Sequence, residues 1–225
     1  MMQFRVAIIG GGLAGTEAAY QLARRNISVT LYEMRPNVKT GIHETPYMGE
    51  LVCSNSLGSQ ELTSASGLLK KELTDLDSFF LKTVLPYRVP SGLSLSIDRI
   101  EAAKAIDKAI SSCGNITVVR QEISSLPEHF DALIIASGPL TSPELAQSLQ
   151  KITKRRYLYF YDATSPIIRY HSIDQNKIFR ASRYDKGEPD FLNISLDENQ
   201  YHTFLEALLS AKCVPLQEID APIFY

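Results

Sequence analysis

The residues most able to do chemistry near the N-terminus form a glycine-rich loop with the spacing G-x-G-x-x-G. A β-branched, apolar run over residues 4–9 precedes this loop, and an amphipathic run over 16–25 follows it. In such a unit the first glycine permits a tight turn, the second lets a pyrophosphate approach the backbone, and the third lets the helix pack closely on the strand. The start of the helix also offers N–H groups to phosphates. We therefore predict that a dinucleotide binds the loop made of Gly10, Gly11, Gly12, Leu13, Ala14 and Gly15.

Glu33 follows the next predicted strand, residues 28–32, at the position from which an acid reaches ribose hydroxyls. The alternative is a strand–turn–helix unit whose glycines serve packing only. The glycine spacing fits FAD and NAD equally well. Its place at the N-terminus favours FAD, and so do Ser137 and Gly138, which follow a predicted strand over 132–136 where the chain would return to the cofactor.

Composition excludes several classes of protein. Hydrophobic residues make up 44% of the 225 residues, which is enough for a packed core. The sequence has no apolar run long enough to span a membrane, and its N-terminus lacks a cleavage-site pattern. Its three widely spaced cysteines, Cys53, Cys113 and Cys213, predict neither a disulfide framework nor a metal site. We expect a protein of the reducing cytoplasm that binds no membrane and no metal.

Charge is distributed unevenly along the chain. Residues 151–186 carry 9 Lys and Arg against 3 Asp and Glu, whereas residues 187–225 carry 1 against 7. A basic stretch of this kind can meet phosphates. The simpler interpretation, a solvated surface whose charges cancel across the fold, is favoured when charge is considered alone.

The order of predicted elements indicates an α/β fold. Helices are predicted over 68–80 and 99–110, short strands over 116–120 and 132–136, and a long polar loop over 35–66. After about residue 150, an aromatic strand is predicted over 157–161, further strands over 167–170 and 191–194, and a helix within 196–210. We predict a Rossmann-like FAD/NAD(P)-binding domain of the glutathione-reductase type over 1–150. Part of an inserted or appended α+β subdomain, incomplete, would follow over 151–225.

Several motifs occur in an order that resembles the folate- and FAD-dependent tRNA (uracil-5-)-methyltransferase family along essentially the whole chain. They are YEMRP (32–36), ELVCSNS (50–56), ASGPLTS (136–142), YLYFYDA (157–163) and ASRYDKGE (181–188). The resemblance implies an enzyme that methylates C5 of the T-loop uridine in tRNA. It also implies 5,10-methylenetetrahydrofolate as carbon donor, reduced FAD as reductant and NAD(P)H to regenerate it.

The same resemblance assigns roles to residues of the polar loop. It implies that Cys53 is catalytic, since a thiolate that adds to C6 of uracil makes C5 nucleophilic. A cysteine seen alone would more often be a small buried hydrophobe. Ser54 and Asn55 are expected to bind the flavin or the folate. His43 is expected either to contact flavin or substrate or to lie on the surface.

Arg183 and Lys186 lie in the basic stretch and are expected to receive the folate glutamate tail or RNA phosphate. The alternative is a turn held by internal ion pairs. Cys113 and Cys213 match no motif.

Three alternatives to this function remain open. One is the related flavoprotein that installs aminomethyl groups on the wobble uridine, although ELVCSNS and ASRYDKGE are not expected there. Another is a paralogue that acts on ribosomal RNA, and the third is a non-catalytic FAD- or RNA-binding remnant. Family members continue beyond residue 225 into a Gly-Cys-x-Pro segment with a second candidate nucleophile. We therefore expect an N-terminal portion that has no methyltransferase turnover by itself.

Overall fold

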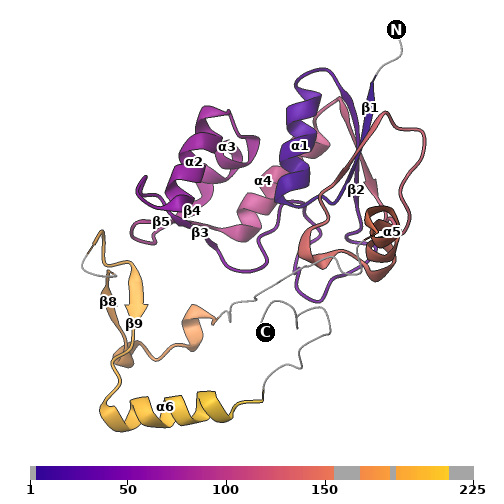
Figure 1. Ribbon diagram of the computed structural model, residues 1–225. Coiled ribbons are helices and arrows are strands. Elements are labelled where there is room, and N and C mark those ends of the chain that lie inside the picture. The colour runs from indigo at the N-terminus through magenta and orange to yellow at the C-terminus, as the bar shows by residue number, and fades with distance from the viewer. Residues whose placement is uncertain (1–3, 155–167, 183–185, 213–225) are drawn as a thin grey trace. The chain divides into compact units, whose positions relative to one another are not determined.

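The computed structural model describes residues 4–154, 168–182 and 186–212. The chain divides into two compact units, one formed by Met1–Val89 with Ser94–Ser165 and the other by Pro90–Leu93 with Pro166–Tyr225 (Figure 1). The predicted strand over 157–161 lies outside the described residues. The predicted domain boundary near residue 150 stays a prediction.

A parallel four-stranded sheet forms the centre of the first unit. Its strands are β1 (Arg5–Ile9), β2 (Ser28–Glu33), β6 (Ile116–Arg120) and β7 (Ala132–Ile135), in the order β6-β2-β1-β7. β1 is apolar and almost wholly buried, as a central parallel strand should be. Consecutive strands β1 and β2 lie side by side, while β7 pairs with the other edge of β1. This arrangement confirms the predicted Rossmann-like α/β class.

Helix α1 (Leu13–Ala23) connects β1 to β2 and packs on both strands. It begins three residues earlier than the predicted start at 16, because the end of the glycine loop is already helical. Helix α4 (Arg99–Ser111) is capped by Asp98, whose carboxylate accepts hydrogen bonds from the N–H groups of Ile100 and Glu101. This helix start confirms the prediction. Figure 1 shows α1 and α4 beside the sheet, with α2 and α3 further out.

The single helix predicted over 68–80 is wrong. The chain forms α2 (Ala65–Asp75) and α3 (Phe79–Val84), and between them Asp77 takes a left-handed conformation with φ 63°. Ser78 caps α3 by accepting from Leu81, and Glu17 of α1 accepts from the N–H groups at the start of α3. These caps satisfy the donors of a new helix start, so the helices separate here.

Several elements were missed by the sequence prediction. A three-stranded antiparallel sheet consists of β3 (Ser56–Ser59), β5 (Ser94–Ile97) and β4 (Arg88–Val89), and β3 lies inside the segment predicted as loop. Further elements of this unit that the prediction missed are the 3-10 helices η1 (Leu85–Tyr87) and η2 (Gly138–Leu140) and the helix α5 (Pro143–Thr153). The short strands lack the alternating pattern by which strands are recognised.

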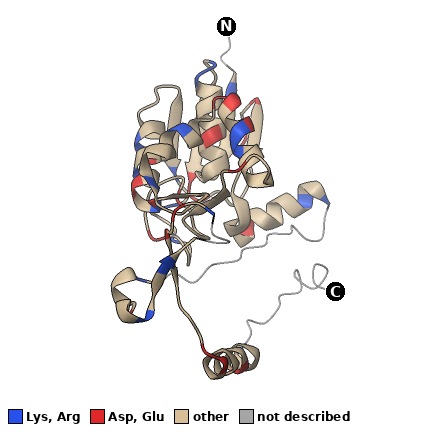
Figure 2. Cartoon of the chain, turned by 90° about the vertical axis from the view of Figure 1, so that its left-hand side faces the viewer, with Lys and Arg blue, Asp and Glu red and all other residues tan. Residues whose placement is uncertain are grey.

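The second unit contains a two-stranded antiparallel ladder of β8 (Phe179–Ala181) and β9 (Phe191–Asn193), followed by α6 (Glu198–Ser210). Two 3-10 helices, η3 (Tyr170–Ser172) and η4 (Gln175–Lys177), precede it. The prediction of a strand over 167–170 is therefore wrong for its described residues, 168–170. The predictions of a strand at 191–194 and of a helix within 196–210 are confirmed. Figure 2 shows basic residues on η4 and β8 and acidic residues on α6.

No helix in the described ranges is long and apolar enough to cross a membrane.

Candidate functional site

The glycine loop lies where the order of the parallel strands reverses. β2 leaves one side of β1 and β7 occupies the other, so a crevice opens beyond the carboxyl end of β1, where open α/β sheets bind ligands. Gly10 has φ 106°, and a Cβ there would lie 2.5 Å from the carbonyl oxygen of Ala136. A glycine is therefore required for the two turns at the ends of β1 and β7 to meet.

The N-terminus of α1 has the features of an anion-binding site. Gly12 is the N-cap residue and gives no side-chain cap, and the first turn carries no acidic residue. The N–H groups of that turn have no partner within the helix and carry its partial positive charge. A Cβ at Gly12 would meet nothing within 4 Å, so the space above the backbone is open. This end of α1 can receive a phosphate group.

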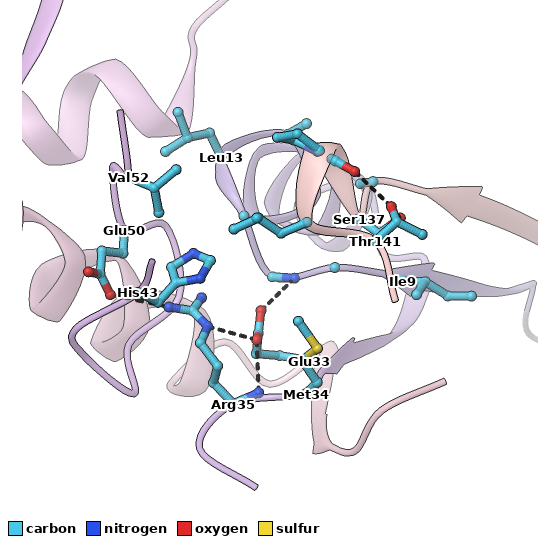
Figure 3. Close-up of a pocket in the computed structure, with 18 of the residues that line it drawn as sticks. Ile9, Leu13, Glu33, Met34, Arg35, His43, Glu50, Val52, Ser137 and Thr141 are labelled. Carbon is cyan, nitrogen blue, oxygen red and sulfur yellow. Dashed lines mark hydrogen bonds and ion pairs between the residues drawn. The ribbon is translucent and has the colours of Figure 1, made fainter. Parts of the chain in front are cut away.

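A pocket of about 420 Å³ lies over this loop (Figure 3). It is lined by segments from the ends of β1, β2, β6 and β7 and by the residues around Cys53. Its volume falls in the range of small-molecule and cofactor sites. Among the described residues, no group of three His, Cys, Asp or Glu side chains could hold a metal ion.

Most of the residues predicted from the sequence line this one pocket. They are Gly10, Gly11, Gly12, Leu13, Ala14, Glu33, His43, Cys53, Ser54, Ser137 and Gly138. Residues that lie far apart in sequence, those of the glycine loop, of the cysteine loop and of the turn after β7, therefore share a site. Their individual roles stay predictions.

Gly15 and Asn55 do not line this pocket. Gly15 packs α1 against the glycine loop, because a Cβ there would lie 1.8 Å from the carbonyl oxygen of Gly10. Asn55 is exposed, and its carbonyl accepts from the N–H of Ile97 at 3.0 Å. Lys186 is an exposed residue of the second unit, and Arg183 lies outside the described residues.

The turn after β7 contributes a hydroxyl pair to the pocket. Ser137 Oγ and Thr141 Oγ1 share a hydrogen bond of 2.7 Å, and Thr141 Oγ1 also donates to the carbonyl of Gly138 at 2.7 Å. Figure 3 shows this pair on the side of the pocket formed by the end of β7. Thr141 thereby fixes the orientation of the serine that the sequence prediction singled out.

A buried chain of three charges forms the opposite wall. Arg35 Nε donates to Glu33 Oε1 at 3.0 Å, and Arg35 Nη1 donates to Glu50 Oε2 at 3.2 Å. All three residues are buried, and in Figure 3 Arg35 lies between the two carboxylates. Each charge has an opposite partner, which is the condition for keeping charges away from water.

Glu50 also orders the segment that carries His43. Its Oε1 accepts from the N–H of Glu44 at 2.9 Å, and its Oε2 accepts from the N–H of Thr45 at 3.0 Å. His43 Nδ1 shares a hydrogen bond of 2.6 Å with Thr40 Oγ1. The segment before Cys53 is therefore organised around one buried carboxylate.

Arg35 and Glu50 were not predicted as site residues. Both stand in motifs that the sequence prediction used, but their types alone indicate solvated charges. The signal that could have found Arg35 is its place two residues after the acid that ends β2, since a charge so close to a buried acid needs a partner.

The carboxylate of Glu33 accepts from the N–H of Gly11 at 3.0 Å and from the N–H of Arg35 at 2.9 Å. Burial raises the pKa of Glu33 and is the largest single influence. The hydrogen bonds and charge of Arg35, with the N–H of Gly11, together outweigh burial and hold the pKa below its ordinary value of 4.5. Each carboxylate oxygen has two lone pairs, so Glu33 retains capacity to accept from a ribose hydroxyl.

This lowered pKa predicts a change in acid stability. A carboxyl whose pKa falls on folding stabilises the folded chain above its unfolded pKa, and that contribution is lost as pH falls through the folded value. We expect Glu33→Gln to cost about 1–3 kcal/mol at neutral pH and to flatten the loss of stability below 4.5. Urea unfolding at a series of pH values measures this, with Glu72→Gln on the exposed face of α2 as control. Parallel pH profiles for the two variants would contradict the assignment.

The sequence profile of the family described as "Glucose inhibited division protein A" matches residues 5–224. A protein from Sulfurihydrogenibium sp. is 45% identical over 221 residues, which are 98% of this chain and 50% of that protein. One from Anoxybacillus flavithermus is 47% identical over 220 residues, with the same two shares. Both are named methylenetetrahydrofolate--tRNA-(uracil-5-)-methyltransferase TrmFO. The chain spans about half the length of these curated relatives.

Among solved structures, the GidA protein of Aquifex aeolicus has a TM-score of 0.49 and 16% identity, over 61% of this chain and 25% of that one. A similarity at this level supports no argument about function.

Proposed function

The chain belongs to the glucose inhibited division protein A family, and we propose that it carries the FAD site and the reactive cysteine of a folate-dependent tRNA (uracil-5-)-methyltransferase. The two curated relatives described above bear that name and match 98% of this chain. The activity, the RNA and folate partners and the cofactor are proposals for this chain, which spans half of those relatives. We also propose that NAD(P)H is the source of electrons and that the protein works in the cytoplasm.

One observation supports the proposal most strongly. The glycine loop lines the same pocket as the segment around Cys53, which is specific to the resemblance, although the two lie far apart in sequence. An open anion site at the start of α1, next to a pocket that is largely apolar, suits a dinucleotide with an aromatic ring system. The residues present therefore fit FAD.

The predicted site residues have proposed tasks. The first turn of α1 would hold the pyrophosphate, and Glu33 would accept from the ribose of the ADP half. Ser54 and the Ser137–Thr141 pair would bind the remaining polar groups of the cofactor or the folate. His43 lines the same pocket and would contact substrate. Lys186 and Arg183 would meet RNA phosphate or the folate tail, as their charge suggests.

The proposed reaction replaces the C5 hydrogen of uridine by a methyl group. The Cys53 thiolate would add to C6 of the uracil, and C5 would then attack the methylene carbon of the folate. The C5 proton would be lost, the thiolate would leave, and tetrahydrofolate would be released. The two electrons that bring the carbon from the methylene to the methyl level would come from FAD held in this pocket and reduced by NAD(P)H.

Transfer of isotope tests this function. The protein expressed from the complete reading frame is incubated with T-loop RNA, ¹³C-methylene-tetrahydrofolate and NADH or NADPH. We expect 5-methyluridine with one added ¹³C by mass spectrometry, and no product when S-adenosylmethionine replaces the folate. Label in a ribosomal RNA fragment but not in the T-loop would assign a ribosomal target, and absence of label in both would contradict the proposal.

A further inference from the structure

Five residues close a ring of bonds between the glycine loop and the segment before Cys53. The N–H of Gly11 donates to Glu33 at 3.0 Å, Glu33 accepts from Arg35 at 3.0 Å, and Arg35 donates to Glu50 at 3.2 Å. Gly49 precedes Glu50 in the chain, and its N–H donates a hydrogen bond to the carbonyl oxygen of Gly11 at 2.8 Å, which closes the ring. We call this set of residues the charge ring.

The charge ring has little room to adjust. A Cβ at Gly11 would lie 2.8 Å from both Glu33 Oε2 and Met48 Cγ, so the backbone of Gly11 is already packed tightly against these two side chains. The exposed fractions of Glu33, Arg35 and Glu50 are 6%, 3% and 5%. Hydrogen bonds between charges strengthen away from water, and the loss of one partner there is costly. If one residue of the charge ring moves, the other residues of the ring must therefore move with it.

The charge ring joins two parts of the pocket that the proposed function uses separately. Gly11 belongs to the loop that would hold the pyrophosphate, and Glu33 would bind ribose. Glu50 lies three residues before Cys53, and the intervening Leu51 and Val52 also line the pocket. We propose that Arg35 is a positioning residue that couples occupation of the dinucleotide site to the placement of Cys53. This inference rests on the proposed cofactor site.

The coupling has a definite physical origin. A ligand phosphate near Gly11, or a ribose hydroxyl at Glu33, competes for the bonds that hold Arg35 in the ring. The hydrogen bond from Arg35 to Glu50 then becomes stronger or weaker. Glu50 passes this change on, because it holds the segment before Cys53 by accepting from the N–H groups of Glu44 and Thr45. Couplings of this kind between two sites typically change an affinity or a reactivity by about fivefold or more.

The test measures alkylation of Cys53 by iodoacetamide in the protein expressed from the complete reading frame, with and without saturating ADP. Mass spectrometry of the Cys53 peptide gives the rate, and the Cys113 peptide in the same sample is the internal reference. We expect ADP to change the Cys53 rate at least about fivefold in the unmodified protein. Calorimetry with ADP alone establishes binding independently.

The matched variant is Arg35→Met with Glu50→Gln, which keeps the buried net charge at −1 because one positive and one negative charge are removed together. ADP should still bind, but its effect on the Cys53 rate should fall below about twofold. Arg35→Lys is a second variant if the double variant does not fold. It keeps the charge, but one ammonium cannot donate as a fork to Glu33 and Glu50 together, so the effect should fall here also.

The outcomes separate the two proposals. Binding of ADP without any change at Cys53 would overturn the coupling and leave the cofactor site in place. A full effect retained in the variants would show simple shielding of Cys53 by ADP and would also overturn the coupling. Failure of ADP to bind the unmodified protein would overturn both.

Discussion

Cys53→Ser is expected to lower the rate of methyl transfer to T-loop RNA by at least about 1,000-fold, the scale seen when a covalent nucleophile is removed. Serine keeps the size of the side chain, but its hydroxyl is a weak nucleophile without an activating base. Cys53 is exposed in a pocket wall, so the substitution should leave folding and flavin binding unchanged. Single-turnover formation of 5-methyluridine measures the effect.

The chain provides a matched control for this substitution. Cys113 follows α4 and packs at the margin of the core, away from the pocket lining. Cys113→Ser should keep the rate of methyl transfer within about twofold, at a small cost in stability. Equal rates for Cys53→Ser and the unmodified protein, with the flavin spectrum intact, would rule out Cys53 as the nucleophile.

Alanine at Gly15 and alanine at Gly12 should differ in their effect on stability. At Gly15 the new Cβ would lie 1.8 Å from the carbonyl of Gly10, so α1 must shift away from the glycine loop. We expect Gly15→Ala to cost about 3 kcal/mol of stability and to abolish flavin binding. At Gly12 the Cβ meets nothing within 4 Å, and φ is −75°, which suits alanine. Gly12→Ala should therefore fold with stability within about 1 kcal/mol of the unmodified chain.

The Gly12 variant isolates the contact with the cofactor. A methyl group there would occupy the space through which a pyrophosphate approaches the backbone, and FAD affinity should fall at least about tenfold. Gly114→Ala, also in open space, is the control and should change neither property. Thermal unfolding measures the stability of each variant, and titration with FAD measures its affinity. Unchanged FAD affinity in the Gly12 variant would place the phosphates elsewhere.

Local sequence was sufficient for the part of the fold that holds the glycine loop. The apolar run of β1, the loop spacing and the periodicity of α1 each predict the same unit, and the structure has it. The break between α2 and α3 was missed because it depends on Glu17, a distant residue that caps the new helix. Helical periodicity continues through such a break, and its local sign is Ser78, a residue type that favours helix starts.

The charge ring was missed for a related reason. Arg35 and Glu50 are 15 residues apart, and their pairing depends on a loop that folds back over the end of β2. Neither spacing nor composition predicts that two such residues are buried together. In contrast, the shared location of the glycine loop and Cys53 could be anticipated, because the motifs were already associated through one family resemblance.

The visible spectrum of the protein expressed from the complete reading frame tests the central claim, that the pocket over the glycine loop holds FAD, most directly. We predict flavin absorption bands at about 370 and 450 nm, present on purification or after addition of FAD. The same bands should be lost or strongly weakened in Gly12→Ala, while Gly114→Ala keeps them. A colourless protein that fails to take up added FAD would contradict the account, and so would a Gly12 variant that binds FAD as tightly as the unmodified protein.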